Sequence, residues 1–210
     1  MGGTRRLVIV LVAGLTFSLL GAAVIEKQEK GAEKRVVASA VATTTTVVPT
    51  TTTTAVAVTR PLRPVAAPRE EYAPEQIVEI GTIEIPRIGL SHRVMHGISM
   101  RNIDLGPSHW PGTAMPGENG NAVFAGHRVT HTHPFRNIDQ LVSGDQVIFR
   151  INGLKSTYSV TGSEVVFPDA LRITDQTVEP TATLFACHPP HSARQRYVVH
   201  LALVESVPDV

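Results

Sequence analysis

The sequence has one cysteine in 210 residues, Cys187, and a single cysteine cannot form a disulfide within its own chain. This excludes the disulfide-stapled scaffolds that are common among small exported domains. Nor is there an excess of positive charge: 19 Lys and Arg stand against 18 Asp and Glu, so no basic field favours nucleic acid as a partner. Aromatic residues are few, and nine of the ten lie at or after Tyr72, which predicts a folded core in the C-terminal two-thirds of the chain.

Charged residues are also absent from residues 7–25, an apolar run that comes directly after Arg5 and Arg6. At helical rise these nineteen residues come close to spanning the core of a bilayer. The run predicts a membrane anchor with residues 1–6 in the cytoplasm. A cleaved signal peptide is the alternative, because residues 21–23 (Gly-Ala-Ala) suit signal peptidase. Four basic residues between 27 and 35 oppose this orientation, so the charge pattern alone does not predict an external domain.

A second stretch without charge, residues 36–59, belongs to a segment rich in Thr and Pro. Such a segment cannot bury enough apolar surface to offset the entropy of folding, so we expect a disordered stalk over residues 26–74. A stalk of this kind, with or without O-linked glycans, is most useful outside the cell. We therefore expect a single-pass protein of the cell membrane with an extracellular domain at residues 75–210.

Short runs rich in Val, Ile, Thr, Phe and Tyr fill this domain, and Gly, Pro, Asn or Asp bounds each run. Such runs predict β-strands, and about seven or eight strands in some 125 residues predict a single all-β sandwich or barrel. Only PFRNIDQL, residues 134–141, indicates a short helix, with Pro134 in its first turn. The predicted strands include VEIGTIEIPRI, NAVFAGH, DQVIFRI, STYSVTGSEVVF, TATLFA and RYVVHLALV.

Cys187 lies between the apolar run TATLFA and a polar loop, HPPHSARQ, that leads into the next predicted strand. A free cysteine is most often a small buried apolar residue, but a position at a strand end favours a reactive one. If the two strands pair antiparallel, Arg196 lies beside Cys187 across the loop mouth. A neighbouring arginine favours the thiolate, which is the nucleophilic form, and can donate hydrogen bonds to an oxyanion.

A cysteine nucleophile also needs a general acid and base. His127 closes the run NAVFAGH, so we expect its side chain on the rim of the barrel. His188 comes directly after Cys187, and successive strand residues point to opposite faces, which counts against it. His127, His131 and His133 together suggest a zinc site, but no carboxylate lies between residues 123 and 137 to orient the rings. We therefore expect no metal and no other cofactor.

These elements resemble the sortase family of cysteine transpeptidases. TLFACHPPHSARQRYVV is similar to the family's cysteine stretch, with an arginine nine positions later, and NAVFAGHR to its strand ending in the catalytic histidine. GTIEIPRIGL and VMHGI look like its first two strands. GPSHWPGTAMPGENGN, GHRVTHTHPF and CHPPHSARQR look most like class E of high-GC Gram-positive bacteria such as actinobacteria, with class D next. The resemblance implies a closed β-barrel of about eight strands with short helices.

The resemblance also implies roles for three residues. Cys187 would attack the Thr–Gly bond of an LPXTG- or LAXTG-type sorting signal on an exported protein. His127 would act as general acid and base, and Arg196 would hold the substrate and stabilise the oxyanion. The acyl chain would pass to an amine of a peptidoglycan precursor such as lipid II, or to a pilin lysine. Covalent catalysis of this kind needs neither ATP nor a metal.

Two residues depart from the family pattern. Ala186 stands where threonine usually precedes the cysteine, and Trp110 where class E usually has a tyrosine associated with its preference for LAXTG over LPXTG. An indole donates a hydrogen bond but cannot accept one, so the motif preference stays open, and Trp110 belongs either to the substrate pocket or to ordinary packing. A hairpin shifted by two residues would present Arg194 in place of Arg196, although the family spacing favours Arg196. Otherwise Arg194 and Arg128 are expected to be solvated charges.

Two other functions fit parts of the sequence. An L,D-transpeptidase also uses cysteine, histidine and arginine, but its arginine is expected two residues after the cysteine, where this chain has Pro189. A stalked surface adhesin, or a sortase-like barrel that only binds, fits the Thr- and Pro-rich segment equally well. It predicts that Cys187→Ala leaves function intact, whereas a transpeptidase would lose all activity in that variant.

Overall fold

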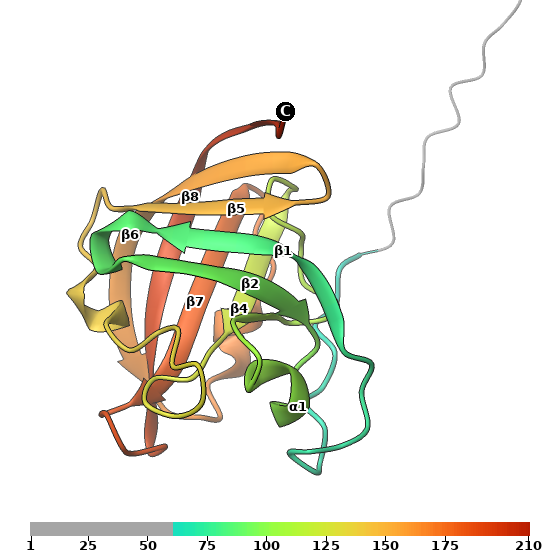
Figure 1. Cartoon of the computed structure of the whole chain (residues 1–210), viewed down its shortest axis with the longest axis vertical. Helices are drawn as coiled ribbons and strands as arrows, with labels where there is room; N and C mark the ends of the chain where they lie inside the picture. The colour runs from blue at the N-terminus through green and yellow to red at the C-terminus, as the bar shows by residue number, and fades with distance from the viewer. Residues whose placement is uncertain (1–60) are drawn as a thin grey trace, which may run out of the picture. The chain divides into compact units, whose positions relative to one another are not determined.

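The computed structural model describes residues 61–210, which contain eight β-strands, one short α-helix and three 3-10 helices (Figure 1). The predicted membrane segment, residues 7–25, and residues 26–60 of the predicted stalk lie outside this range. No helix within residues 61–210 combines the length and apolar character needed to cross a bilayer. The elements are β1 (Val78–Ile85), a 3-10 helix (Pro86–Ile88), β2 (Leu90–His96), α1 (Met100–Ile103), β3 (Ser108–His109), β4 (Gly120–Ala125), a 3-10 helix (Ile138–Gln140), β5 (Gln146–Ile151), β6 (Leu154–Val166), a 3-10 helix (Leu171–Thr174), β7 (Pro180–His188) and β8 (Gln195–Pro208).

The strands close into one barrel in the order β1–β2–β3–β4–β7–β8–β6–β5, and β5 pairs back onto β1. The pairs β2–β3 and β4–β7 are parallel, and the other pairs are antiparallel. Helix α1 lies at the end of the barrel opposite the C-terminus (Figure 1). The prediction of an all-β closed barrel of eight strands is confirmed.

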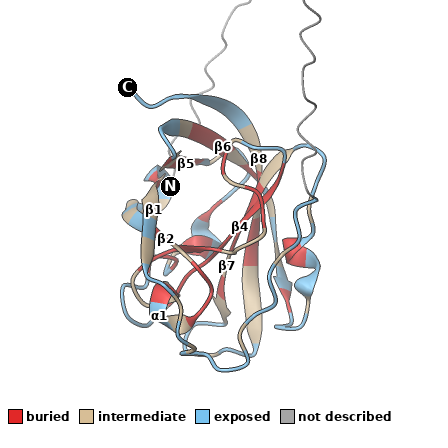
Figure 2. Ribbon diagram, turned by 90° about the vertical axis from the view of Figure 1, so that its right-hand side faces the viewer, coloured by how far each residue is buried: buried red, intermediate tan, exposed pale blue. Residues whose placement is uncertain are grey.

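Alternate strand residues fill the barrel interior with large apolar side chains. Phe124 of β4 stacks on Phe149 of β5 with ring centroids 4.6 Å apart, and Phe149 meets Tyr158 of β6 edge-on at 5.7 Å. These three side chains, with Leu184 of β7 and Leu201 of β8, are buried, and buried residues (red in Figure 2) mark the strands that enclose the core. The packing fixes β4 and β7 relative to each other, and with them the residues at their ends.

The outer faces of β4 and β7 are covered by the segment that contains the 3-10 helix Leu171–Thr174. The side-chain amide of Asn121 on β4 donates to the carbonyl oxygens of Ile173 and Asp175 at 3.0 and 3.2 Å. Its amide oxygen accepts a hydrogen bond from Thr183 of β7 at 2.9 Å. Strand β4 is buried on both faces, and the polar side chain of Asn121 has all its hydrogen-bond partners supplied by the covering segment and by β7.

Residues 61–74 form no strand or helix, yet they contact the barrel, which differs from the disordered stalk predicted over residues 26–74. The N–H of Val65 donates to the carbonyl oxygen of Pro111 at 2.8 Å. In return, Nε1 of Trp110 donates to the carbonyl oxygen of Val65 at 2.7 Å. Composition did not reveal these contacts, because they satisfy backbone groups and depend little on the side chains of the segment.

The helix predicted at residues 134–141 is a series of turns that includes one 3-10 helix, Ile138–Gln140. The N–H of Phe135 donates to the carbonyl oxygen of His127 at 3.1 Å, and Phe135 and Ile138 are buried in the core. This bond fastens the segment to the loop after β4, so its backbone does not continue into an α-helix.

Candidate active site

Strands β7 and β8 form the antiparallel hairpin that the sequence suggested. Cys187 lies directly opposite Arg196, and Ala186 lies opposite Tyr197. Directly paired residues project on the same face of a sheet, so the thiol and the guanidinium emerge together. Arg194 lies in the loop before β8, and the two-residue shift that would put it opposite Cys187 does not occur.

Strand β4 brings His127 to the same edge of the barrel. In the parallel register of β4 and β7, the last pair is Ala125 with Phe185. His127 and Cys187 each lie two residues further along, and the N–H of Gly126 donates to the carbonyl oxygen of Phe185 at 3.1 Å. Equal offsets from a paired position place two side chains side by side at the carboxyl edge of parallel strands. The sequence put both residues at strand ends, and the register brings those ends together.

A cavity of about 160 Å³ opens at this edge, and Cys187, His127 and Arg196 all line it. Its other walls are mostly apolar, and polar groups gather at one side, which is the usual character of a site for a small ligand or an extended peptide. The remaining lining residues are Ala67, Ile98, Met100, Ile103, Trp110, Ala125, Gly126, Phe185 and Ala186.

Trp110 is one wall of this cavity and also packs against its neighbours. The centroid of its ring is 6.1 Å from that of Phe185, and its N–H is used by the carbonyl oxygen of Val65. Because this single donor is occupied, the indole offers a ligand an apolar surface and no hydrogen bond. Both roles considered for Trp110, packing and lining the pocket, are therefore combined in one side chain.

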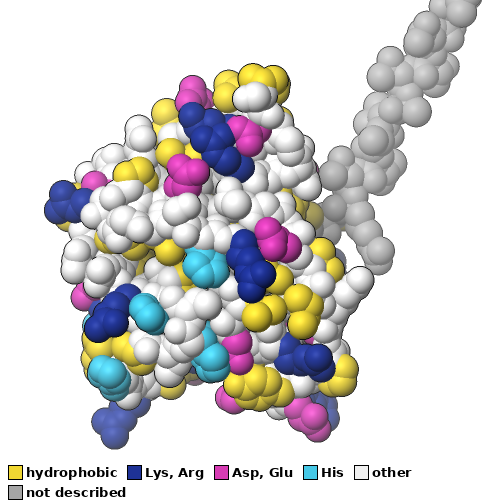
Figure 3. All heavy atoms as spheres, viewed as in Figure 1, with side chains coloured by type: hydrophobic (Ala, Val, Ile, Leu, Met, Phe, Trp, Pro, Cys, Tyr) yellow, Lys and Arg dark blue, Asp and Glu magenta, His cyan; other side chains and the backbone are white. Residues whose placement is uncertain are grey.

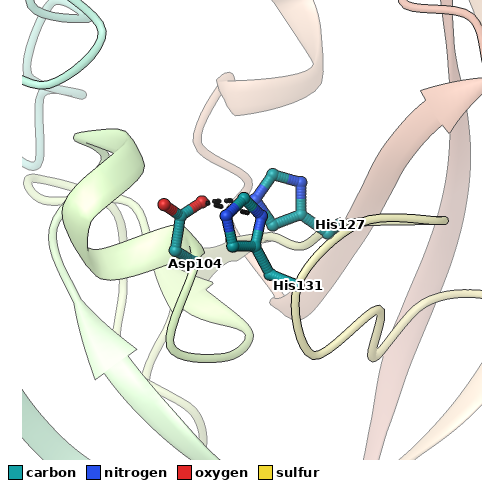
Figure 4. Close-up of side chains that lie close together, drawn as sticks. All are labelled: Asp104, His127 and His131. Carbon is teal, nitrogen blue, oxygen red and sulfur yellow. Dashed lines mark hydrogen bonds and ion pairs between the residues drawn. The ribbon is translucent and has the colours of Figure 1, made fainter.

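His127 is held on both ring nitrogens, and Figure 4 shows the contact with Asp104. Its Nε2 lies 2.7 Å from Oδ1 of Asp104, in the turn after α1, and its Nδ1 lies 3.0 Å from Oγ1 of Thr130. The carboxylate can only accept, so it places the proton of the neutral ring on Nε2 and leaves Nδ1 as the basic nitrogen. Sequence reasoning missed Asp104, which lies 23 residues before His127 in an unrelated segment.

The histidine cluster differs from the zinc set suggested by the sequence. His131 stacks on His127 with ring centroids 4.8 Å apart, and its Nδ1 lies 3.3 Å from Oδ1 of Asp104. His133 stands apart, with its Nδ1 bonded to the backbone oxygen of His131 at 3.0 Å. The carboxylate that appeared to be lacking is supplied by Asp104 through the fold. Several histidine side chains (cyan) are visible in the lower half of the face shown in Figure 3.

Among the described residues, the hydrogen-bond partners of Arg196 are backbone carbonyl groups. Its Nη1 donates to the carbonyl oxygens of Ala193 and Gln195 at 2.9 and 3.0 Å. It forms no ion pair with any carboxylate within residues 61–210. Its charge is therefore free to attract a carbonyl oxygen or oxyanion beside the Cys187 thiol.

Arg128 is not the solvated charge that we expected. The residue is 2% exposed, its Nη2 lies 2.6 Å from Oδ2 of Asp139, and its Nη1 lies 2.7 Å from Nδ1 of His188. Its guanidinium also stands over the ring of Tyr197, 5.7 Å from the centroid. These contacts turn His188 toward a buried arginine, in agreement with the alternation of strand residues that counted against His188 as the acid and base.

Fold and site together define a closed β-barrel whose cysteine and arginine share one hairpin and whose histidine comes from the parallel neighbouring strand. The family model described as "Sortase domain" matches residues 83–204, which is 122 of the 210 residues. The chain belongs to the sortase family.

Known relatives agree with this assignment. Sortase D of Bacillus subtilis is 28% identical over 136 residues, which cover 63% of this chain and 67% of the relative. The alignments of this chain with two other curated relatives span 57% and 40% of the length of those proteins. The structure of a Clostridium perfringens Sortase D5 transpeptidase is 30% identical, with a TM-score of 0.56, over 60% of this chain and 79% of that chain. That of Sortase E1 from Streptomyces coelicolor, with a tripeptide in the active site, is 25% identical, with a TM-score of 0.58, over 62% and 90%.

Proposed function

We propose that the chain is a sortase transpeptidase in which Cys187 is the nucleophile, His127 the general acid and base, and Arg196 the group that stabilises the oxyanion. One observation carries the proposal: the β4–β7 and β7–β8 registers bring these three residues to one edge, where they line one cavity. Membership of the sortase family supports the same chemistry.

In the first half of the reaction, the Cys187 thiolate adds to the carbonyl carbon of a Thr–Gly bond in an exported protein. The negative charge moves to the carbonyl oxygen, where Arg196 donates hydrogen bonds. When the tetrahedral intermediate collapses, the C–N bond breaks and a proton from His127 goes to the departing glycine amine. The products are a thioester on Cys187 and the released C-terminal peptide.

In the second half, an amine attacks the thioester carbonyl, His127 takes the proton of that amine, and the C–S bond breaks to restore the thiolate. The acceptor in this proposal is the amine of a cell-wall precursor such as lipid II, or a pilin lysine. When water takes its place, the same centre acts as a cysteine endopeptidase.

The surroundings of His127 indicate which nitrogen exchanges the proton. Asp104 accepts from Nε2–H, so Nδ1 is the atom that gains and loses a proton during turnover. Nδ1 lies against the Thr130 hydroxyl, so this bond has to open, or the hydroxyl has to relay the proton, when substrate is bound.

The apolar walls suit the leucine and the proline or alanine of an LPXTG- or LAXTG-type signal, with Trp110 forming part of the substrate pocket. The sequence also supports a protein held at the outer face of the cell membrane, with residues 7–25 as a single-pass anchor and a Thr- and Pro-rich stalk up to the barrel.

The test uses the full chain in mild detergent, incubated with Leu-Ala-x-Thr-Gly and Leu-Pro-x-Thr-Gly peptides, with and without a glycine-type amine. Intact-mass spectrometry should show an adduct of the peptide truncated after threonine, which is absent from Cys187→Ala and released as the amide when the amine is added. The preferred peptide reports which motif the Trp110 pocket accepts. Folded protein with a reactive thiol and no adduct from either peptide would contradict the proposal and favour a barrel that only binds.

A further inference from the structure

Asp104, His127 and His131 form a compact cluster at the edge of the catalytic cavity (Figure 4). One ligating atom of each residue lies within 4.8 Å of those of the other two. Oδ1 of Asp104 is shared, at 2.7 Å from Nε2 of His127 and 3.3 Å from Nδ1 of His131. The three side chains come from two segments, the turn after α1 and the loop after β4, and converge on one point.

Two imidazoles and one carboxylate are a ligand set that borderline transition metals prefer, and zinc commonly takes three protein ligands of this kind and keeps a fourth position open. Ligands of a metal usually carry a hydrogen-bond partner on their second polar atom. Here Thr130 Oγ1 lies 3.0 Å from Nδ1 of His127, and the Tyr72 hydroxyl donates to Oδ2 of Asp104 at 3.2 Å. Two of the three candidate ligands are thus already oriented as metal ligands are.

We propose that Asp104, His127 and His131 bind a transition-metal ion such as Zn²⁺, and that the bound ion switches the transpeptidase off reversibly. An ion on Nε2 of His127 leaves Nδ1 as the N–H of a neutral ligand. That nitrogen can neither accept a proton nor form the imidazolium that protonates a leaving amine. Binding follows from the geometry of the three residues alone, whereas the inhibition rests on the proposed function.

The binding experiment removes the competing ligand first, because a thiolate also binds zinc. The full chain carrying Cys187→Ala, without a histidine tag, is titrated with zinc sulfate in a calorimeter. We expect one equivalent to bind. Adding His131→Ala or Asp104→Asn should weaken the affinity by at least about tenfold, since loss of a ligand costs no less than loss of a residue that supports one. His133→Ala, a change outside the cluster, should leave the affinity unaltered, and calcium should not compete, because it prefers oxygen ligands.

The second experiment measures transpeptidation by the Cys187 protein with zinc and then with EDTA. Zinc should abolish turnover and EDTA should restore it, and His131→Ala should need at least about tenfold more zinc for half-inhibition, relative to its own metal-free rate. Zinc inhibition without binding to the Cys187→Ala protein would place the ion on the thiol and overturn the site. Equal affinity in the His131→Ala and parent proteins would also overturn it. Zinc binding that depends on His131, in a protein with no transpeptidase activity, would establish the metal site and contradict the proposed function instead.

Discussion

The two faces of the wall formed by β4, β7 and β8 use the same strands for different purposes. On the inner face, Ala186 and Leu184 of β7 pack in the core. His109 of the neighbouring β3 and Arg128 of the loop after β4 are buried there and bonded to neighbouring groups. On the outer face, one position away from the core residues, Cys187, His127 and Arg196 line the cavity. A shift of one residue in register would exchange the two faces. The strand register therefore decides which side chains pack in the core and which face the cavity. Substitutions on each face can test this separation.

The largest effect is expected on the outer face. Arg196→Ala should lower kcat about 10²- to 10³-fold, because the oxyanion loses a donor placed beside Cys187. The matched control is Arg194→Ala, which lies in the loop before β8 and should leave kcat close to the parent value. Steady-state kinetics with a sorting-signal peptide measures both, and near-normal turnover in the Arg196 variant would contradict the assignment.

On the inner face, His109 should make stability depend on pH. Burial lowers the pKa of His109 to about 4, although its hydrogen bond to the Ala114 carbonyl opposes the shift. Between pH 6.5 and 4 the unfolded chain therefore binds a proton that the folded chain does not, and stability falls as the pH drops. The expected loss is about 3 kcal/mol, measured by urea unfolding followed through the fluorescence of the single tryptophan.

His109→Gln should remove this dependence. The carboxylate of Glu164 also titrates differently in the folded chain, but at lower pH. Hydrogen bonds from Arg172 lower the pKa of Glu164 to about 2, so its contribution to stability is present above pH 4.5 and is lost only as the pH falls from about 4.5 toward 2. An unchanged slope between pH 6.5 and 4.5 in His109→Gln would assign the dependence to other groups.

The third test returns to the outer face. Asp104→Asn should lower kcat about 10- to 100-fold with little change in KM. The carboxylate can only accept, whereas an amide can also donate through its NH2 group, so the tautomer of His127 is no longer fixed. Assays in EDTA exclude a metal effect. As a positioning residue, Asp104 acts through its acceptor oxygen, so Asp104→Glu should restore part of the rate. An Asp104→Glu variant as slow as Asp104→Asn would indicate a structural role only.

The smallest effect is expected from Arg128→Met, which leaves Asp139 and His188 without their shared partner. The free energy of unfolding should fall by about 1–3 kcal/mol, with kcat changing far less. Arg136→Met is the control at an exposed arginine nearby and should change stability by less than about 0.5 kcal/mol. A fall in kcat that remains when the assay is run under conditions where the variant is fully folded would place Arg128 in catalysis.

Sequence patterns predicted what depends on local order. The β-prone runs bounded by turn residues predicted an all-β sandwich or barrel, and the resemblance to sortases implied the barrel. A cysteine and an arginine on either side of one loop predicted their pairing as Cys187 with Arg196. The position of His127 at a strand end was informative for the same reason. Each of these predictions rests on residues within a single strand or hairpin.

Contacts made only by the tertiary fold were not predictable. Asp104 meets His127 because α1 lies at the end of the barrel where β4 finishes, and no spacing in the sequence marks that meeting. Arg128 gave the signal of an exposed loop charge, and its burial depends on Asp139 from another turn. Residues 61–74 looked like linker, because hydrogen bonds such as that of Val65 use the backbone.

The hairpin that pairs Cys187 with Arg196 has a consequence for how this protein can diverge. The two residues are held by the ladder of β7 and β8, so residues 189–192, which lie before the Ala193 carbonyl that holds Arg196, connect the strands without setting the distance between nucleophile and arginine. Insertions in an exposed connection cost little free energy. Evolution, or a designer, can therefore lengthen this loop to recognise new substrates while the reactive pair stays in place.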